Sequence, residues 1–295
     1  MGRKPTLPRV WHFASFGAPG VVIYLCFVMA PILISFGYSL TNHNPFDPPA
    51  EFVGLKNYRL LFQDEQFLAA LRVTTILTVI VVVVPNVLGL GVALLLDRKG
   101  WLYNALRSVF FTPVILSSVV VSIIWTKLLD DRGPVNDALR ALGVEHPPGW
   151  LSDPDLALYS VASIVCWQML GFCVVVYLAG LQGVPAELLE AAEIDGAGTV
   201  RRFRAVTWPL LAPSLTINTV VLLISAFKTY DYVKVVTNGG PGSGTTATIA
   251  FDVLATGLDA NHVGYASAMA VVMLVIVATL TTIVLRFLRR REVDL

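Results

Sequence analysis

Residues 183–213 read GVPAELLEAAEIDGAGTVRRFRAVTWPLLAP, a charged segment that separates two long apolar ones. Pro185 stands where a helix begins and where its missing N–H is not needed, and Glu187 follows in the first turn, where the helix dipole favours an anion. The alanine-rich stretch after it favours a helix with little side-chain bulk, and Gly196 offers a stop. A second short helix is expected over residues 199–206, so the segment predicts two helices joined by a bend.

The composition outside this segment is typical of a membrane protein. Hydrophobic residues make up 56% of the 295 residues and charged residues only 14%, and the mean hydropathy is +0.72. Soluble domains are typically about 45–50% apolar, and a membrane-spanning helix needs about 20 apolar residues. Stretches that meet this length are residues 18–40, 73–96, 109–126, 156–181, 210–236 and 263–285. The sequence therefore predicts an all-α integral membrane protein with six transmembrane helices.

The positive charges predict how these helices are oriented. Of the 21 Lys and Arg, thirteen fall in the two tails and in the second and fourth connections between spans. They are Arg3, Lys4, Arg9, Arg98, Lys99, Arg107, Arg201, Arg202, Arg204, Arg286, Arg289, Arg290 and Arg291. Because short cytoplasmic segments carry an excess of Lys and Arg, the N- and C-termini are both expected to be cytoplasmic.

Residues 1–40 allow a competing interpretation, a cleaved signal peptide. Their apolar stretch is longer than the usual core of about 7–15 residues, and it lacks a clear small-residue cleavage site. An uncleaved membrane anchor is therefore preferred. The loops of residues 41–72 and 127–155 are then expected outside the cytoplasm, with a short helix at the membrane surface within residues 52–62.

The distribution of polar residues disfavours several functional classes. The net charge is +1 and the basic residues are dispersed, so no nucleic-acid partner is expected. The four histidines show no metal-ligand spacing. Cys26, Cys166 and Cys173 lie in apolar runs, where a thiol packs as a small hydrophobe. The glycine-rich run at residues 237–246 is not followed by Gly-Lys-Ser/Thr, so no nucleotide-binding loop is predicted.

The charged segment resembles the EAA loop of binding-protein-dependent ABC importer permeases. In that loop, Glu-Ala-Ala is followed after three residues by Gly, and after nine more by Ile-x-Leu-Pro. The matching residues here are Glu190, Ala191, Ala192, Gly196, Val206 and Pro209, with Asp195 and Ala197 completing the run. Val206 stands in place of Ile and Trp208 in place of Leu, and both substitutions keep the apolar character.

Two further stretches resemble carbohydrate-type permeases related to the maltose transporter. TNGGPGSGTT at residues 237–246 is similar to their turn after the fifth helix, and VGLKNY at residues 53–58 is similar to their first external loop. The resemblance implies the type I importer fold. It also implies a division into residues 1–69 (tail, first helix and extracytoplasmic loop), 70–288 (transmembrane core with the coupling loop at 183–213) and 289–295 (cytoplasmic tail).

The resemblance also implies partners. The loop would dock on an ATPase subunit through Glu190, Ala191, Ala192, Asp195 and Gly196. The chain itself would hold no cofactor, because ATP and Mg would be bound by the ATPase. A second permease in a heterodimer, two ATPase subunits, an extracytoplasmic solute-binding protein and a sugar-like solute would complete the system in the bacterial inner membrane, surrounded by lipid. The alternative for the loop is a solvated connector without a partner.

Four polar or aromatic residues are candidates for contact with the solute. Gln168 and Phe172 are four apart in the fourth predicted span and share a face, and Ser225 and Thr229 do the same in the fifth. The aligned positions in maltose-type permeases belong to stretches that contact sugar. An aromatic ring suits a pyranose face, and amide and hydroxyl groups suit its hydroxyls. Helix packing is the open alternative, because Ser, Thr and Gln also bond across spans in lipid.

Two other polar positions have structural interpretations. Asn86 follows Pro85 within the second span and is expected to bond to backbone carbonyls that the proline leaves free. Asp231 lies three residues from both Lys228 and Lys234, so ion pairing near the membrane surface is expected for it, with an outer gate or a contact for the binding protein as alternatives.

Two rival functions make different demands on the sequence. A secondary transporter driven by an ion gradient would predict buried acidic residues in mid-span, and all predicted spans except the fifth contain none. An intramembrane enzyme would need a catalytic Ser, His or Asp cluster, and no His falls in a span. An importer permease without catalytic residues is therefore preferred, and its solute stays open among oligosaccharides, monosaccharides and glycerol-phosphate-like compounds.

Overall fold

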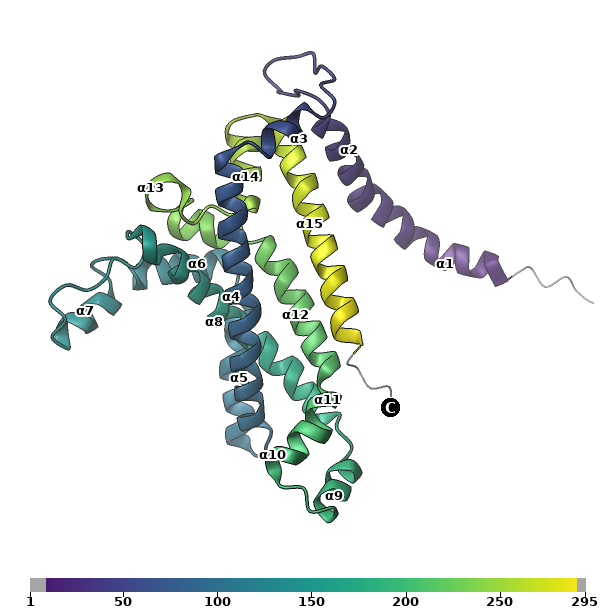
Figure 1. Ribbon diagram of the computed structural model, residues 1–295, viewed down its shortest axis with the longest axis vertical. Coiled ribbons are helices and arrows are strands. Elements are labelled where there is room, and N and C mark those ends of the chain that lie inside the picture. The colour runs from purple at the N-terminus through teal and green to yellow at the C-terminus, as the bar shows by residue number, and fades with distance from the viewer. Residues whose placement is uncertain (1–8, 291–295) are drawn as a thin grey trace, which may run out of the picture. The chain divides into compact units, whose positions relative to one another are not determined.

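The computed structural model describes residues 9–290, and within this range the regular elements are helices and helical turns (Figure 1). The chain divides into two compact units. The N-terminal unit joins the residues up to Gln63 with Val253–Val272, and the large unit joins Asp64–Asp252 with the part from Met273 onward. The expected boundaries at residues 69/70 and 288/289 stay predictions, and most of the expected C-terminal tail lies outside the described residues.

Among residues 9–290, four helical runs are long and apolar enough to cross a membrane, and two bent helix pairs bring the number up to six. The four confirm the first, second, fourth and sixth predicted spans. They are Gly17–Ser39, α4 (Glu65–Leu96), α8 (Pro154–Gln182) and α15 (Val263–Arg289). α4 begins earlier than its apolar run because Asp64 caps it, its carboxylate accepting a hydrogen bond from the Gln66 N–H at 2.9 Å.

The third predicted span, residues 109–126, is wrong as a single helix. α5 (Trp101–Ile115) and α6 (Ser118–Leu128) meet at an angle of 100°. Pro113 lies in the last turn of α5, where its missing N–H weakens the helix, and the chain is extended at Leu116. The bend was hidden in the sequence because the apolar run continues through it.

The fifth predicted span is shorter than residues 210–236. α12 (Ala212–Phe227) ends at the charged stretch that follows, and a π-helical turn, η3 (Val233–Thr237), forms beyond it. Before α12, a helical run over Thr199–Leu210 meets it at 60°. This run consists of α10 (Thr199–Arg202), the π-helical turn η2 (Phe203–Thr207) and α11 (Trp208–Leu210). The predicted end at residue 206 is therefore wrong, because Pro209 lies in the first turn of α11, where its N–H is not needed.

The N-terminal unit consists of one long helical run and a short helix. α1 (Arg9–Tyr24), η1 (Leu25–Met29) and α2 (Ala30–Ser39) follow one another without a break. α3 (Lys56–Leu61) is the predicted short helix, and the buried amide of Asn57 holds it by donating to the carbonyls of Ser39 and Thr41 at 2.9 and 2.8 Å. The turn η4 (Ala255–Asp259) and the first part of α15 complete the unit.

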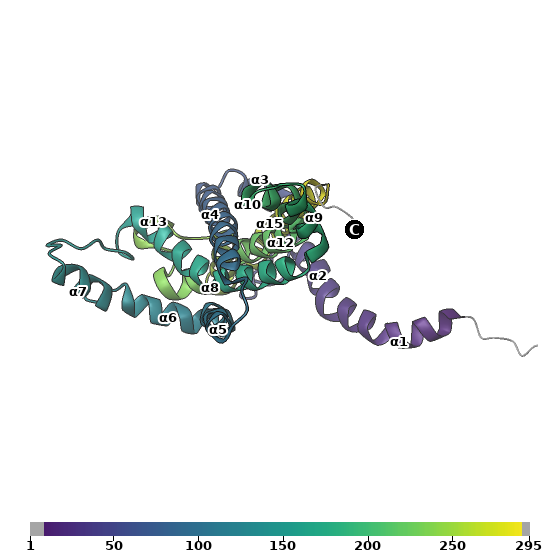
Figure 2. The same cartoon turned by 90° about the horizontal axis from the view of Figure 1, so that it is seen from below.

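The large unit is built around α8, which packs against α4, α5 and α12 (Figure 2). Small residues allow this close approach. A Cβ atom on Gly89 of α4 would lie 2.6 Å from the Cβ of Cys173, and one on Gly171 would collide with the Phe110 carbonyl of α5. Cys166 and Cys173 are buried, free thiols, which confirms their predicted packing role.

Three short helices complete the large unit. They are α7 (Pro134–Ala141), α13 (Pro241–Gly244) and α14 (Ile249–Leu254). α7 projects with α6 away from α4 and α12 in both views (Figures 1 and 2). It is fixed by the buried Asn136, whose side-chain oxygen accepts from the Trp150 indole at 2.8 Å and whose amide donates to the Pro148 carbonyl at 3.3 Å.

Candidate functional site

The segment of residues 183–213, called here the coupling segment, forms the two helices and the bend that its sequence predicts. α9 (Ala186–Ile194) follows Pro185 and carries Glu187 in its first turn. Asp195 ends the helix, and Gly196 adopts a left-handed conformation with φ of +75°. At the same end the Ala197 N–H donates to the Ala192 carbonyl at 2.9 Å. Such a turn is a common helix stop, and glycine adopts it without strain.

One ion pair joins the two halves of the coupling segment. The Arg202 guanidinium of α10 lies 3.1 Å from the Glu193 carboxylate of α9. The Glu193 side chain is 73% exposed, so solvent screens the pair. The bend therefore owes its geometry mainly to the backbone turn at Gly196.

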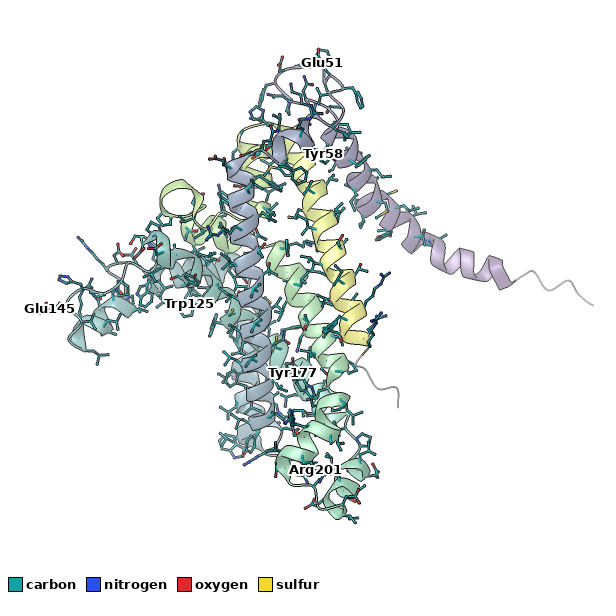
Figure 3. All side chains as sticks on the ribbon, in the orientation of Figure 1. Glu51, Tyr58, Trp125, Glu145, Tyr177 and Arg201 are labelled. Atoms are coloured by element: carbon teal, nitrogen blue, oxygen red, sulfur yellow. The ribbon has the colours of Figure 1, made fainter. Side chains whose placement is uncertain are left out.

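The coupling segment exposes apolar side chains as well as charges. α9 and α10, which both lie within the described range, contain no buried residue. Ile194 is 86% exposed and Val200 is 72% exposed. Leu188, Glu190 and Ala191 are exposed in the same segment, which lies at one end of the large unit, where Arg201 is labelled (Figure 3). The five residues Leu188, Glu190, Ala191, Ile194 and Val200 are called here the coupling surface. Exposed apolar groups among charges typically mark a protein interaction site.

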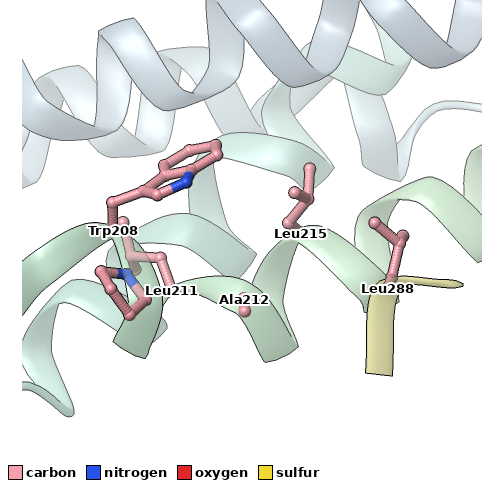
Figure 4. A pocket seen from close by; sticks show the side chains of 6 residues that line it. Trp208, Leu211, Ala212, Leu215 and Leu288 are labelled. Atoms are coloured by element: carbon pink, nitrogen blue, oxygen red, sulfur yellow. The ribbon is translucent and has the colours of Figure 1, made fainter. Parts of the chain in front are cut away.

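A small apolar cavity lies at the bend between α11 and α12 (Figure 4). Its volume is about 230 Å³, and its lining residues are Trp208, Pro209, Leu211, Ala212, Leu215 and Leu288. The Trp208 ring is 40% exposed and lies 6.2 Å from the Phe203 ring, centroid to centroid. The coupling segment thus joins α12 through a bend that side chains do not fill completely.

Of the four candidate solute residues, Gln168 and Thr229 are buried, whereas Phe172 and Ser225 are half-buried. Gln168 is buried, and both ends of its amide are occupied: it donates to the Leu116 carbonyl at 2.8 Å and accepts from the Tyr232 hydroxyl at 2.7 Å. Gln168 therefore satisfies the backbone at the bend between α5 and α6. Phe172 is half-buried and packs against the core of the large unit.

Ser225 and Thr229 also differ in burial. Ser225 is half-buried on α12, whereas Thr229 is buried and lies just beyond the end of that helix. The Thr229 hydroxyl donates to the Ser225 carbonyl at 3.2 Å, and its own carbonyl accepts from the Thr248 hydroxyl at 2.6 Å. The role of all four residues in binding a solute stays a prediction. Sequence reasoning missed Tyr232, because its contact with Gln168 joins residues 64 apart in the chain.

The expectations for Asn86 and Asp231 have different outcomes. The Asn86 amide donates to the Val82 carbonyl at 2.7 Å, which confirms that it bonds to the backbone near Pro85. The Asp231 carboxylate accepts a hydrogen bond of 2.5 Å from the Ser118 hydroxyl at the start of α6, and its expected pairing with the neighbouring lysines stays a prediction. The break after α12 is thereby tied to the bend between α5 and α6.

A buried carboxyl group, which was not singled out in the sequence, lies on α14. Asp252 is 1% exposed; its Oδ1 accepts from the Gln66 amide at a long 3.4 Å, and its Oδ2 has no hydrogen-bond partner within the described residues. Burial raises the pKa of this carboxyl to about 6, with a smaller contribution from the charge of Asp64, while the Gln66 hydrogen bond acts in the opposite direction.

The chain was compared with known proteins. Residues 85–293 match the family described as binding-protein-dependent transport system inner membrane component. The probable starch degradation products transport system permease protein of Thermoanaerobacterium thermosulfurigenes is 32% identical over 97% of this chain and 96% of its own length. The trehalose/maltose transport system permease protein of Thermococcus litoralis is 32% identical over 93% of this chain and 92% of its own.

A solved structure shares the fold. It is the crystal structure of a bacterial ABC transporter involved in the import of the acidic polysaccharide alginate, with a TM-score of 0.80 and 23% identity over 96% of each chain. The helix order, the exposed coupling segment and the family match together lead to one conclusion. This chain belongs to the family of binding-protein-dependent transport system inner membrane components.

Proposed function

We propose that this chain is one of two permease subunits of an ATP-driven importer for a sugar-like solute, and that its coupling surface binds the ATPase subunit. Family membership makes it a multi-pass inner-membrane permease. The named relatives transport starch degradation products and trehalose or maltose, which supports a carbohydrate cargo. In this arrangement the coupling segment and both termini lie in the cytoplasm, and ATP and Mg are bound by two copies of the ATPase.

The single observation that carries the docking proposal is the exposure of Ile194 and Val200 next to Glu190. A helix that held only charges would suit a solvated connector. Large apolar side chains on a short helix outside the spans instead favour insertion into a groove of another protein. Ala191 keeps the same helix narrow, and Glu190 supplies a charge that fixes its orientation.

The geometry also supports a route for force. α8 precedes the coupling segment in the chain and α12 follows it. A displacement of α9 therefore acts on two helices that pack directly against each other. ATP-driven closure of the ATPases would move this segment toward that of the second permease and open the cavity outward, and hydrolysis would reset it. The solute would reach this cavity from an extracytoplasmic binding protein.

Copurification tests the docking proposal. Ile194→Glu places a charge on the most exposed apolar side chain of the coupling surface. We expect it to reduce retention of the ATPase by about tenfold or more, since burying an unpaired charge in an interface costs more than the roughly 1.4 kcal/mol that a tenfold change requires. Glu190→Ala should weaken retention less. Leu142→Glu is the matched control, because Leu142 is 82% exposed beyond the end of α7. Equal retention by the Ile194 and Leu142 variants would refute the docking assignment.

Uptake measurements test the proposed solute residues. We expect Phe172→Ala and Ser225→Ala to raise the KM for uptake while the ATPase stays attached, because both side chains are half-buried and lie outside the coupling segment. Unchanged uptake kinetics in both variants would remove them from the site. Uptake into vesicles that proceeds with an ion gradient and without ATP would favour the secondary-transporter alternative.

A further inference from the structure

Three buried polar side chains meet where α4, α8 and α12 pack together in the large unit. Asn86 of α4 is 7% exposed, Tyr177 of α8 is 1% exposed and Asn218 of α12 is fully buried. The Tyr177 hydroxyl donates to the Asn86 side-chain oxygen at 2.7 Å. Tyr177 is labelled on the coupling-segment side of the bundle in Figure 3. Polar groups inside a membrane bundle are costly, so a cluster drawn from three helices calls for a function.

Asn218 is incompletely satisfied in this cluster. Its amide nitrogen donates to the Cys173 carbonyl at a long 3.5 Å, and its oxygen is buried without a hydrogen-bond partner in the part of the chain that the structure describes. The contact with Cys173 places Asn218 beside Tyr177, because Cys173 precedes Tyr177 by one helical turn on the same face of α8. A buried acceptor that lacks a donor is destabilising. A hydrogen bond from the Tyr177 hydroxyl would satisfy this oxygen.

The hydroxyl of Tyr177 has one proton and two candidate acceptors. A phenolic O–H donates one hydrogen bond, so the oxygens of Asn86 and Asn218 cannot both receive it. The observed arrangement joins α8 to α4 and leaves the acceptor on α12 empty. In the alternative, the hydroxyl turns toward α12 and the Asn218 amide makes a half-turn. This arrangement joins α8 to α12, gives up the long contact of the Asn218 nitrogen with the Cys173 carbonyl, and leaves Asn86 bonded only through its nitrogen to Val82.

The place of these residues along the chain connects the exchange to the coupling segment. Tyr177 lies in the last two turns of α8 and Asn218 in the first two turns of α12, on either side of that segment. Asn86 lies on α4, which is not continuous with the segment. A shift of the coupling segment therefore moves Tyr177 and Asn218 relative to each other and relative to Asn86.

We propose that Tyr177 is a positioning residue of the transport cycle, whose hydroxyl bonds to Asn86 in one state of the permease and to Asn218 in the other. This inference rests on the proposed function, because it takes its two states from the ATP-driven cycle. Coupling between distant sites requires an element with two discrete arrangements. The two alternative hydrogen bonds of Tyr177 provide such an element between the coupling segment and the helix bundle. In a purely structural role each hydrogen bond would be an independent and weak contact between two helices, so that removing one acceptor would not depend on Tyr177.

The test compares Asn86→Leu and Asn218→Leu in the assembled complex in lipid nanodiscs, with ATP hydrolysis measured without solute or binding protein. Each variant removes one of the two acceptors, so we expect the basal rate to rise severalfold in one and to fall severalfold in the other. In the Tyr177→Phe background both shifts should disappear, because no proton is left to exchange. Tyr159→Phe is the matched control, since Tyr159 lies on the same helix and is 56% exposed.

Shifts in the same direction, or shifts that persist in the Tyr177→Phe background, would overturn the proposal. If the leucine variants do not assemble, the Tyr177→Phe complex provides the test. The ratio of ATP hydrolysed to solute transported should then change at least twofold. An unchanged ratio would overturn the proposal. Failure of the proposed function is recognised separately, because the wild-type chain would then not retain an ATPase.

Discussion

α8 and the coupling segment are consecutive in the chain but opposite in burial. α8 is covered by α4, α5 and α12, and its contacts are close enough that glycine is needed at several of them. α9 and α10, both described in full, bury nothing and expose Ile194 and Val200. Both regions are rich in apolar and helix-forming residues. The difference shows that apolar side chains in α8 hold the fold, whereas the fold leaves those in the coupling segment exposed.

The largest expected effect comes from breaking the close packing of α8. Gly89→Ala places a Cβ 2.6 Å from the Cβ of Cys173, so the helices must move apart, and we expect a loss of about 1–3 kcal/mol in stability. Gly91→Ala is the control on the same helix, because nothing lies within 4 Å of its new Cβ. The control should gain up to about 1 kcal/mol from helix propensity. Thermal unfolding of the purified chain in detergent measures both, and equal melting temperatures would contradict the packing account.

The second prediction concerns the carboxyl of Asp252, which is buried but incompletely hydrogen-bonded. The carboxyl of Asp252 is buried outside the candidate membrane spans, and its pKa is raised from 3.8 to about 6. A raised carboxyl pKa contributes stability that is fully present below the unfolded value near 3.8 and is lost as the pH rises through about 6. Asp252→Asn should therefore raise the free energy of unfolding at pH 7.5 by an amount on the order of 2 kcal/mol, and raise it less at pH 5. The melting temperature should rise accordingly.

The control for this measurement is Asp47→Asn, which changes an exposed carboxylate and should leave the melting temperature nearly unchanged at both pH values. A stabilisation by Asp252→Asn that is the same at pH 5 and pH 7.5 would mean that its charge is not the cause.

The smallest effect is expected inside the coupling segment. Arg202→Ala removes the ion pair with Glu193, and screened pairs of this kind typically contribute about 0–1 kcal/mol. The melting temperature should fall by no more than a degree or so, and added salt should make the wild type and the variant indistinguishable. A loss as large as that of Gly89→Ala would show that the ion pair, and not the turn at Gly196, holds the segment together.

Sequence patterns predicted the elements whose causes are local. Long apolar runs located α4, α8 and α15, and Pro185 with Gly196 located both ends of α9. The bend between α5 and α6 was missed, because its apolar run is continuous and the groups that stabilise the bend come from elsewhere. Gln168 and Asp231 supply those contacts from 52 and 113 residues away in the chain.

The candidate site shows the same limit. Glu190, Ala191 and Gly196 could be identified from their spacing, because a short helix with a turn is determined by neighbouring residues. Tyr177 and Asn218 could not be identified from the sequence, since neither has a hydrogen-bond partner nearby in the chain. The role proposed for them depends on Asn86 of another helix. The sequence signal for that contact was the asparagine beside Pro85.

The dependence of Leu116 on Gln168 also affects the order in which the protein can be assembled. The ribosome adds Gln168 52 residues after the carbonyl that it satisfies. Until then the bent pair of α5 and α6 lacks the amide that satisfies the Leu116 carbonyl. The bend is therefore completed only when α8 lies beside it, so this part of the fold forms from pairs of segments rather than from one segment at a time.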